Sequence, residues 1–299
     1  MKNQLNRPPE PGEDELLPVR PNREVPPGGP RVGLALGAGA ARGLAHLAVL
    51  QEMEAAGIAI HAISGSSAGA LVAAIYACGT DLHWAMRLGE SLSWEHLVRV
   101  TVPRLGFLDA ERLLQLVRLL TRNRSFEQTR IPLYILATDI ENGQEVVLHE
   151  GNVAEAVRAS VAIPGVFVPY RLGGRLLVDG GVLNRVPVQI LRDVGMDVVI
   201  GVDVSTAAVP PVRVTNVLGV ILQTIEIMEH EVFRHRSSGA DILIRPDLEG
   251  LSAADFHQAA ELYRRGREAA RQAIPAIKAL LEAGRGAKEQ PSGPSQAVS

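Results

Sequence analysis

The sequence lacks several features that define whole classes of protein. It has one cysteine, Cys78, which cannot form an internal disulfide and excludes zinc sites built from several cysteines. Its 30 Lys and Arg residues face 33 Asp and Glu residues, and no block of like charge occurs. Binding to nucleic acid through release of counterions is therefore disfavoured. We expect a protein of a reducing compartment, with no nucleic-acid partner.

Long apolar runs are also missing. A secretory signal peptide needs a basic start and then about 7 to 15 apolar residues, whereas this chain opens MKNQLNRPPEPGEDELLPVR. The most apolar windows, 32–50 and 58–78, are interrupted by polar residues such as Arg42 and His61, so neither suits a membrane span. We expect a cytoplasmic protein, and peripheral contact with a membrane stays open.

The composition predicts one globular body between two disordered ends. Apolar residues make up 46% of the chain and charged residues 21%, which is typical of globular proteins. Residues 1–30 hold eight of the 19 prolines and few apolar side chains, which indicates a disordered leader. The segment 284–299 has the same character. The expected domain therefore covers 31–283.

Within this domain, short apolar runs alternate with longer helical patterns, which indicates an α/β fold with a mostly parallel sheet. Asn142 and Gly143 predict a hairpin turn and thus one antiparallel pair. The expected strands are 31–36, 58–64, 132–139, 144–149, 175–178, 197–204 and 241–245. The expected helices are 40–56, 67–78, 109–120, 152–160, 187–194, 215–236 and 253–281.

The sharpest motif is a G-x-S-x-G pattern, formed by Gly65, Ser67 and Gly69 with Ser66 and Ala68 between them. It follows an apolar strand pattern and opens a helix pattern. A serine at such a turn projects its hydroxyl from the sheet edge, above the positive end of the helix. The alternative is an ordinary turn in which Ser66 or Ser67 caps the helix.

A second turn, rich in small residues, follows the first expected strand. Its members are Gly37, Ala38, Gly39, Ala40, Ala41, Arg42 and Gly43. Main-chain N–H groups in such a turn can converge on a phosphate or an oxyanion. The pattern lacks the Gly-Lys-Ser/Thr of a Walker loop and the third glycine of a dinucleotide fingerprint. Close packing of helix on sheet would explain the small residues equally well.

A third motif, Asp179-Gly180-Gly181, follows the apolar run LLV. A carboxylate at a strand end could act as the base for Ser67, because nucleophile and base need only meet in space. The alternative is an aspartate that caps its own turn.

No histidine suits a conventional triad. His230, His235 and His257 follow the acid but lie in helical patterns that favour solvated faces. An aspartate acting directly on the serine would form a two-residue dyad.

These motifs carry a family resemblance. The ordered segments GAGAARGLAHLAVL, GSSAGA, ASVAIPGVFVPY and LVDGGVLNRVP resemble the patatin-like phospholipases, and most of all the bacterial proteins related to the catalytic domain of neuropathy target esterase. The resemblance covers about residues 31–283. It implies a three-layer α/β/α fold, a Ser67–Asp179 dyad and an oxyanion hole in the glycine-rich turn.

One departure from the family pattern concerns the first motif. Family members usually read G-G-G-G-A-R-G there, whereas Ala38 and Ala40 replace two glycines in this chain. The hole survives if neither alanine needs a positive φ; if one does, the donors would be misdirected and activity lowered.

The resulting expectation is a serine hydrolase of lipid esters, phospholipids or lysophospholipids, that needs no metal or other cofactor. N–H groups near Gly39, Ala40 and Ala68 would hold the oxyanion. Arg42 would position the loop, attract an anionic head group or form an ordinary ion pair. The amphipathic pattern at 103–122 would cover an acyl pocket, rest on anionic lipid or simply pack on the sheet.

Two rival functions stay open. A nucleotide-binding regulatory module would use the glycine-rich turn for phosphate, and a membrane-associated module would bind vesicles with little hydrolysis.

Overall fold

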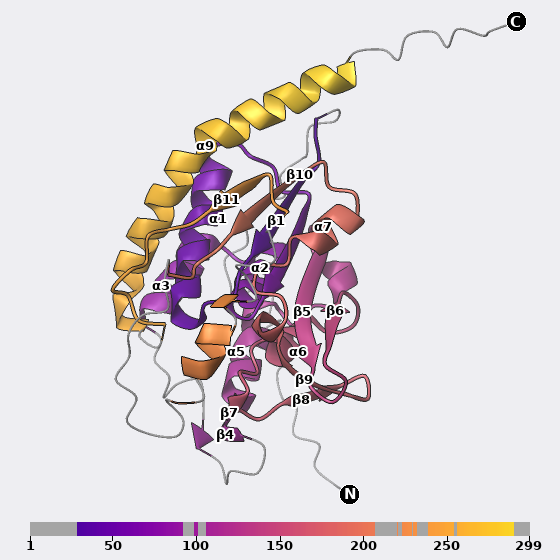
Figure 1. Cartoon of the computed structure of the whole chain (residues 1–299), viewed down its shortest axis with the longest axis vertical. Coiled ribbons are helices and arrows are strands. Elements are labelled where there is room, and N and C mark those ends of the chain that lie inside the picture. The colour runs from indigo at the N-terminus through magenta and orange to yellow at the C-terminus, as the bar shows by residue number, and fades with distance from the viewer. Residues whose placement is uncertain are drawn as a thin grey trace, which may run out of the picture.

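The computed structural model describes residues 29–91, 99–100, 106–206, 220, 223–228, 230–231, 239–253 and 256–289 (Figure 1). Nearly all of the expected leader, the tail from 290 onward and most of the helix expected at 215–236 lie outside the described residues. The described parts of that last segment, 220, 223–228 and 230–231, are helical.

A central sheet forms the middle layer. Its strands are β1 (Val32–Leu36), β2 (Ala62–Ser66), β5 (Leu133–Asp139), β6 (Gln144–Leu148), β8 (Tyr170–Leu172), β9 (Arg175–Asp179), β10 (Val198–Val202) and β11 (Ile242–Ile244). They are arranged in the order β11-β10-β1-β2-β5-β9-β8, and β6 pairs with β5. The pairs from β11 to β5 are parallel, whereas β6, β8 and β9 pair in antiparallel fashion. The hairpin expected at Asn142 and Gly143 joins β5 to β6.

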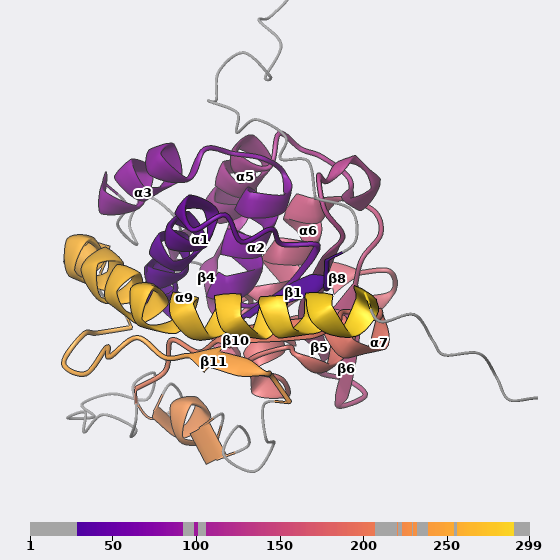
Figure 2. The ribbon, with the colours of Figure 1, turned by 90° about the horizontal axis from the view of Figure 1, so that it is seen from above.

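Helices cover both faces of this sheet. They are α1 (Ala45–Ala55), α2 (Ala68–Ala77), α3 (Leu82–Ser91), α5 (Glu111–Leu120), α6 (Val153–Ser160), α7 (Gln189–Asp193) and α9 (Ala259–Glu289), with the 3₁₀ turn η2 (Ala40–Leu44) before α1. Figure 2 shows α1, α2, α5 and α6 gathered on one side of the sheet. Leu191 of α7 packs with Ala35 and Val199 on the opposite face. The fold is therefore a three-layer α/β/α sandwich.

Burial explains the apolar strand patterns. All five residues of β1 and all five of β10 are buried, because parallel strands in the middle of the sheet meet helices on both faces. Leu34 and Ile200 face the larger core beneath α1 and α2. Thus the continuous apolar runs correctly predicted central strands.

Several expected boundaries differ from the structure. β2 begins at Ala62 rather than 58, because its partner β1 begins at Val32 and the register pairs Gly33 with Ala62. The strands β7 (Gly165–Phe167) and β8 were not expected, since each spans three residues. β7 pairs with β4 (Gly106–Asp109), which pairs with β3 (Arg99–Val100), in a second small sheet. The helix α3 was missed as well.

The last helix is longer than expected. α9 continues to Glu289, beyond the position 284 where the sequence predicts a disordered tail. It packs along α1 on the flank of the molecule (Figure 1), and Arg267 and Arg271 pair with Glu52 of that helix. A Cβ on Gly266 would lie 2.5 Å from the Ala45 carbonyl oxygen, so this glycine permits the close approach of the two helices. Within the described residues, no helix has the length and apolarity needed to cross a membrane.

Candidate active site

Ser67 occupies a tight turn between β2 and α2. Its backbone has φ 55° and ψ −122°, a conformation that residues other than glycine rarely adopt. The flanking glycines make the turn possible. A Cβ on Gly65 would lie 2.4 Å from the Gly69 carbonyl oxygen, and one on Gly69 would lie 2.1 Å from that of Leu36. The pattern G-x-S-x-G therefore reflects a steric requirement on both sides of the serine.

Asp179 meets Ser67 across β5, which separates their two strands. β5 lies between β2 and β9, and its Leu136 and Ala137 pair with Ser66 and Asp179 respectively. The Ser67 hydroxyl donates a hydrogen bond of 2.6 Å to Asp179 Oδ2 across 112 residues of sequence. The sheet thus brings the two predicted residues into direct contact.

The two glycines that follow Asp179 have separate tasks. The N–H of Gly181 donates to Asp179 Oδ1 at 2.8 Å, which holds the carboxylate in place. A Cβ on Gly180 would lie 2.3 Å from the Leu136 carbonyl oxygen, so this position has no room for a side chain. The Asp-Gly-Gly motif therefore fixes both the orientation of the acid and its closeness to β5.

Burial tunes the acid. Asp179 is 3% exposed and Ser67 is 5% exposed. Loss of solvent raises the pKa of Asp179 from 3.8 to about 6, against the opposing effects of the Ser67 hydroxyl, the Gly181 N–H and the charge of Arg185. The carboxylate is a stronger base than an exposed aspartate and is still mostly ionised at neutral pH.

The glycine-rich turn is anchored at its beginning. Gly37 donates its N–H to the Val202 carbonyl at 2.9 Å, and Ala38 donates to the Arg185 carbonyl at 2.9 Å. The Gly37 carbonyl accepts from His46 Nε2 at 2.8 Å. Since a carbonyl oxygen only accepts, Nε2 carries the proton of this imidazole. Burial lowers the pKa of His46 to about 4, so the ring is neutral at pH 7.

Beyond these anchors, the backbone offers open donors. Within the described part of the chain, no acceptor bonds the N–H groups of Gly39, Ala40 or Ala68. Ala40 and Ala68 line the same cavity as Ser67. Unpaired donors beside a serine hydroxyl are what an oxyanion requires.

The two alanines of this turn differ in conformation. Ala40 has φ 47°, in the left-handed region that favours glycine, whereas Ala38 does not have a positive φ. A positive φ at either alanine was expected to misdirect the donors and lower activity, and Ala40 has such a φ. The Ala40 N–H nevertheless stays unpaired among the described residues, beside the Ser67 cavity. The consequence is local strain at Ala40.

Arg42 is buried in an ion-pair network. Its side chain is 1% exposed and donates to Glu226 Oε1 at 2.9 Å. The same carboxylate lies 3.7 Å from Arg185, which in turn lies 3.9 Å from Asp203. Of the three roles considered for Arg42, this geometry favours the ion pair that positions the turn.

Sequence reasoning missed the contribution of Ser160. Its hydroxyl accepts the Ser67 N–H at 2.9 Å and donates to the Leu136 carbonyl at 2.6 Å. Ser160 therefore ties the Ser67 turn to β5. It lies in the segment ASVAIPGVFVPY, and only the pairing of distant elements reveals what its hydroxyl does. His46 was missed for the same reason.

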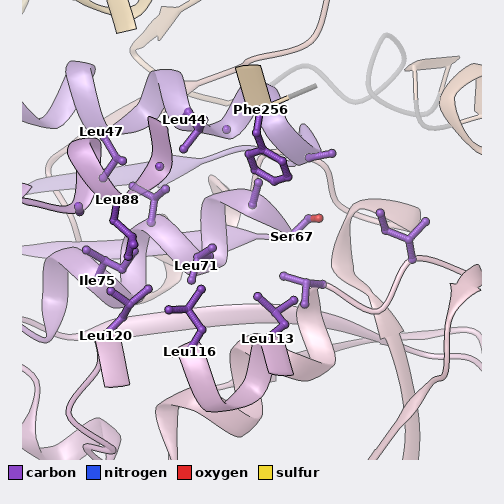
Figure 3. A pocket seen from close by; sticks show the side chains of 18 of the residues that line it. Leu44, Leu47, Ser67, Leu71, Ile75, Leu88, Leu113, Leu116, Leu120 and Phe256 are labelled. Atoms are coloured by element: carbon purple, nitrogen blue, oxygen red, sulfur yellow. The ribbon is translucent and has the colours of Figure 1, made fainter. Parts of the chain in front are cut away.

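An apolar cavity opens at Ser67 (Figure 3). Ser67 is the one polar side chain among the described residues that line it. Leu113, Leu116 and Leu120 of α5 face the cavity, so the amphipathic helix expected near 103–122 forms one wall. Leu71 and other apolar residues of α2 line the cavity as well. The residues 101–105 before α5 lie outside the described part of the chain.

The other candidates lie apart from this arrangement. His257 is exposed and His230 is half-buried, whereas His235 lies outside the described residues. No group of three or more metal-ligating side chains occurs among the described residues.

A serine on a strand-to-helix turn, hydrogen-bonded to a buried acid beside open main-chain donors, is an arrangement typical of acyl-transfer sites. Comparison with known proteins agrees. The model of the patatin-like phospholipase family matches residues 34–192. The chain belongs to this family.

Two relatives illustrate the relationship. An uncharacterized NTE family protein of Mycobacterium bovis is 40% identical over 190 residues, which are 62% of this chain and 52% of that protein. Lysophospholipase NTE1 of Cryptococcus neoformans is 34% identical over 186 residues, which are 60% of this chain and 11% of that protein. The chain thus spans about half the length of the first relative and a small part of the second.

Two solved structures are distantly similar. VipD from Legionella pneumophila has a TM-score of 0.49 and 13% identity, covering 84% of this chain and 67% of that one. The type III effector protein ExoU has a TM-score of 0.45 and 15% identity, covering 88% of this chain and 54% of that one.

Proposed function

We propose that this protein is a serine acyl hydrolase that cleaves the carboxylic esters of lipids, with phospholipids or lysophospholipids as the substrate class. The single observation that carries the proposal is the 2.6 Å hydrogen bond from Ser67 to a buried Asp179. Membership of the patatin-like phospholipase family and 34% identity to a protein named lysophospholipase support the lipid substrate. The proposed catalytic unit covers residues 31–283.

The first half of the reaction acylates the enzyme. Asp179 accepts the proton of the Ser67 hydroxyl while Oγ attacks the ester carbonyl carbon. The tetrahedral oxyanion accepts hydrogen bonds from the N–H groups of Gly39, Ala40 and Ala68. Each such donor typically lowers the barrier by about 3 to 4 kcal/mol. When the intermediate collapses, the alcohol leaves with the proton held by Asp179, and the acyl group stays on Ser67.

The second half releases the acid. A water molecule gives a proton to Asp179 and attacks the acyl carbon, and the same N–H groups hold the second oxyanion. Collapse returns the proton to Ser67 and frees the carboxylic acid. Apart from substrate and water, every group used in these steps belongs to a described residue.

Hydrolysis of p-nitrophenyl esters and of a lysophospholipid tests this function. Wild-type protein should cleave both, and Ser67→Ala should lose at least about 10³-fold in kcat, because the nucleophile is gone. Asp179→Asn should lose a similar factor with little change in KM. Unchanged turnover in Ser67→Ala would refute the proposed nucleophile. Unchanged turnover in Asp179→Asn, with activity lost in Ser67→Ala, would refute only the dyad.

The rival nucleotide-binding function has weaker support. The N–H groups of Gly37 and Ala38 already bond to carbonyls, so these two donors of the turn are not open to a phosphate. Thermal stabilisation by a nucleotide, unaffected by Ser67→Ala, would favour that function instead.

A further inference from the structure

The cavity beside Ser67 is elongated, and its lining has no group that could pair with a charge. Its described walls consist of alanine, glycine, valine, leucine, isoleucine and phenylalanine, apart from Ser67. Burying a charged or zwitterionic head group there would be strongly unfavourable. An apolar chain would gain free energy from the same walls. The cavity therefore suits the acyl part of an ester and excludes its head group.

The positions of the lining residues give the cavity a direction. Ser67, Leu71 and Ile75 follow each other at intervals of four on one face of α2. In Figure 3, Ser67 lies at one end, Leu71 and Leu116 lie midway, and Ile75, Leu88 and Leu120 lie at the far end. Eight helical residues rise about 12 Å, which an extended alkyl chain of roughly ten carbons would span.

Two buried side chains close part of the far end. Ile75 is 5% exposed and Leu120 is 3% exposed. Leu88, at the same end, is half-buried, as are Leu71 midway along the cavity and Phe256. A chain that enters at Ser67 would thus meet packed side chains after about ten carbons.

We propose that this cavity binds a single unbranched acyl chain of about eight to twelve carbons, and that Ile75, Leu88 and Leu120 set the upper limit of its length. The inference rests on the proposed ester hydrolysis at Ser67. Each methylene up to that limit should raise kcat/KM by about fourfold, because it leaves water for an apolar wall. Longer chains should gain nothing further or lose activity.

The test uses p-nitrophenyl esters with acyl chains of two to sixteen carbons. Leu120→Ala should move the optimum toward longer chains by removing part of the far end. Leu71→Phe should lower the ratio of kcat/KM for long-chain esters to kcat/KM for the acetate ester by at least tenfold. Leu114→Ala is the matched control, since Leu114 is 3% exposed on the same helix but does not line the cavity. It should keep the wild-type optimum.

A binding measurement separates this proposal from the proposed function. Ser67→Ala cannot turn over but keeps the cavity, so it should bind decanoic acid more tightly than acetic acid, and Leu71→Phe in the same background should weaken decanoic acid binding at least tenfold. If no ester is cleaved while this binding pattern holds, the hydrolase proposal fails and the acyl site stands. A chain-length profile that is flat, or that neither Leu120→Ala nor Leu71→Phe changes, would overturn the acyl-site proposal.

Discussion

At the scale of single residues, the site combines strain with burial. Ser67 and Ala40 both have positive φ, and Asp179 is an almost fully buried carboxylate. Each of these features costs stability, and each places a chemical group where the reaction would need it. Conflicts of this kind between local preference and the folded structure are expected at functional sites.

The raised pKa of Asp179 predicts the pH dependence of activity. Only the ionised carboxylate can accept the Ser67 proton, so kcat/KM for a p-nitrophenyl ester should rise with pH through an apparent pKa of about 6 and level off above it. Initial rates between pH 4.5 and pH 8 measure this. A profile that is flat from pH 4.5 upward would contradict Asp179 as the base.

The same pKa predicts that the contribution of Asp179 to stability falls as pH rises, whereas activity rises. Because folding raises the pKa of Asp179 from 3.8 to about 6, its protonated form stabilises the fold below about pH 4, and this contribution is lost as pH rises through 6. Asp179→Asn should therefore be more stable than wild type at pH 8, by about 3 kcal/mol or less, and by little at pH 4. Urea unfolding of both proteins at pH 8 and pH 4 measures this gain in stability. A gain of equal size at the two pH values would refute the prediction.

Relief of strain at Ala40 can be tested against its neighbour. Ala40→Gly should raise the free energy of unfolding by up to about 1 kcal/mol, because φ 47° favours glycine. Ala38→Gly should lower it by about 0.5 to 1 kcal/mol, since Ala38 is 4% exposed and has no positive φ. Urea denaturation of both variants measures the contrast. A change in the free energy of unfolding in the same direction for both variants would contradict the strain argument.

At the scale of elements, the glycine-rich turn depends on α1. His46, in the first turn of that helix, is the side chain that holds the Gly37 carbonyl. His46→Ala should lower kcat by about 10-fold to 100-fold with little change in KM, because displaced donors no longer reach the oxyanion. His46→Gln keeps an N–H donor and should recover most of the loss. Equal kcat values for the two variants would show that the hydrogen bond to Gly37 does not position the turn.

The helical residues 223–228 are tied to the site through Glu226. Replacing Glu226 by Gln leaves the buried Arg42 and Arg185 without their shared carboxylate, so the free energy of unfolding should fall by about 2 to 4 kcal/mol. Glu141→Gln is the control, because Glu141 and Arg171 form an exposed pair whose loss should cost less than about 1 kcal/mol. Comparable losses in the two variants would contradict a structural role for the network.

At the scale of the whole molecule, the sequence predicted what depends on local pattern. Continuous apolar runs gave the central strands, and the glycines around Ser67 and Asp179 marked two strand ends that the sheet brings together. The contacts of His46 and Ser160 could not be predicted, because each joins elements whose packing is set by the whole fold. The cavity is likewise a product of packing, since α2, α3 and α5 each supply part of its wall.

The central claim is that Ser67 is a nucleophile activated in this fold, and covalent labelling with a fluorophosphonate tests it most directly. Intact mass measurement followed by peptide mapping should find one adduct per chain, located on Ser67, with no adduct in Ser67→Ala and slow labelling in Asp179→Asn. An adduct on another residue, or labelling that persists in Ser67→Ala, would contradict the account.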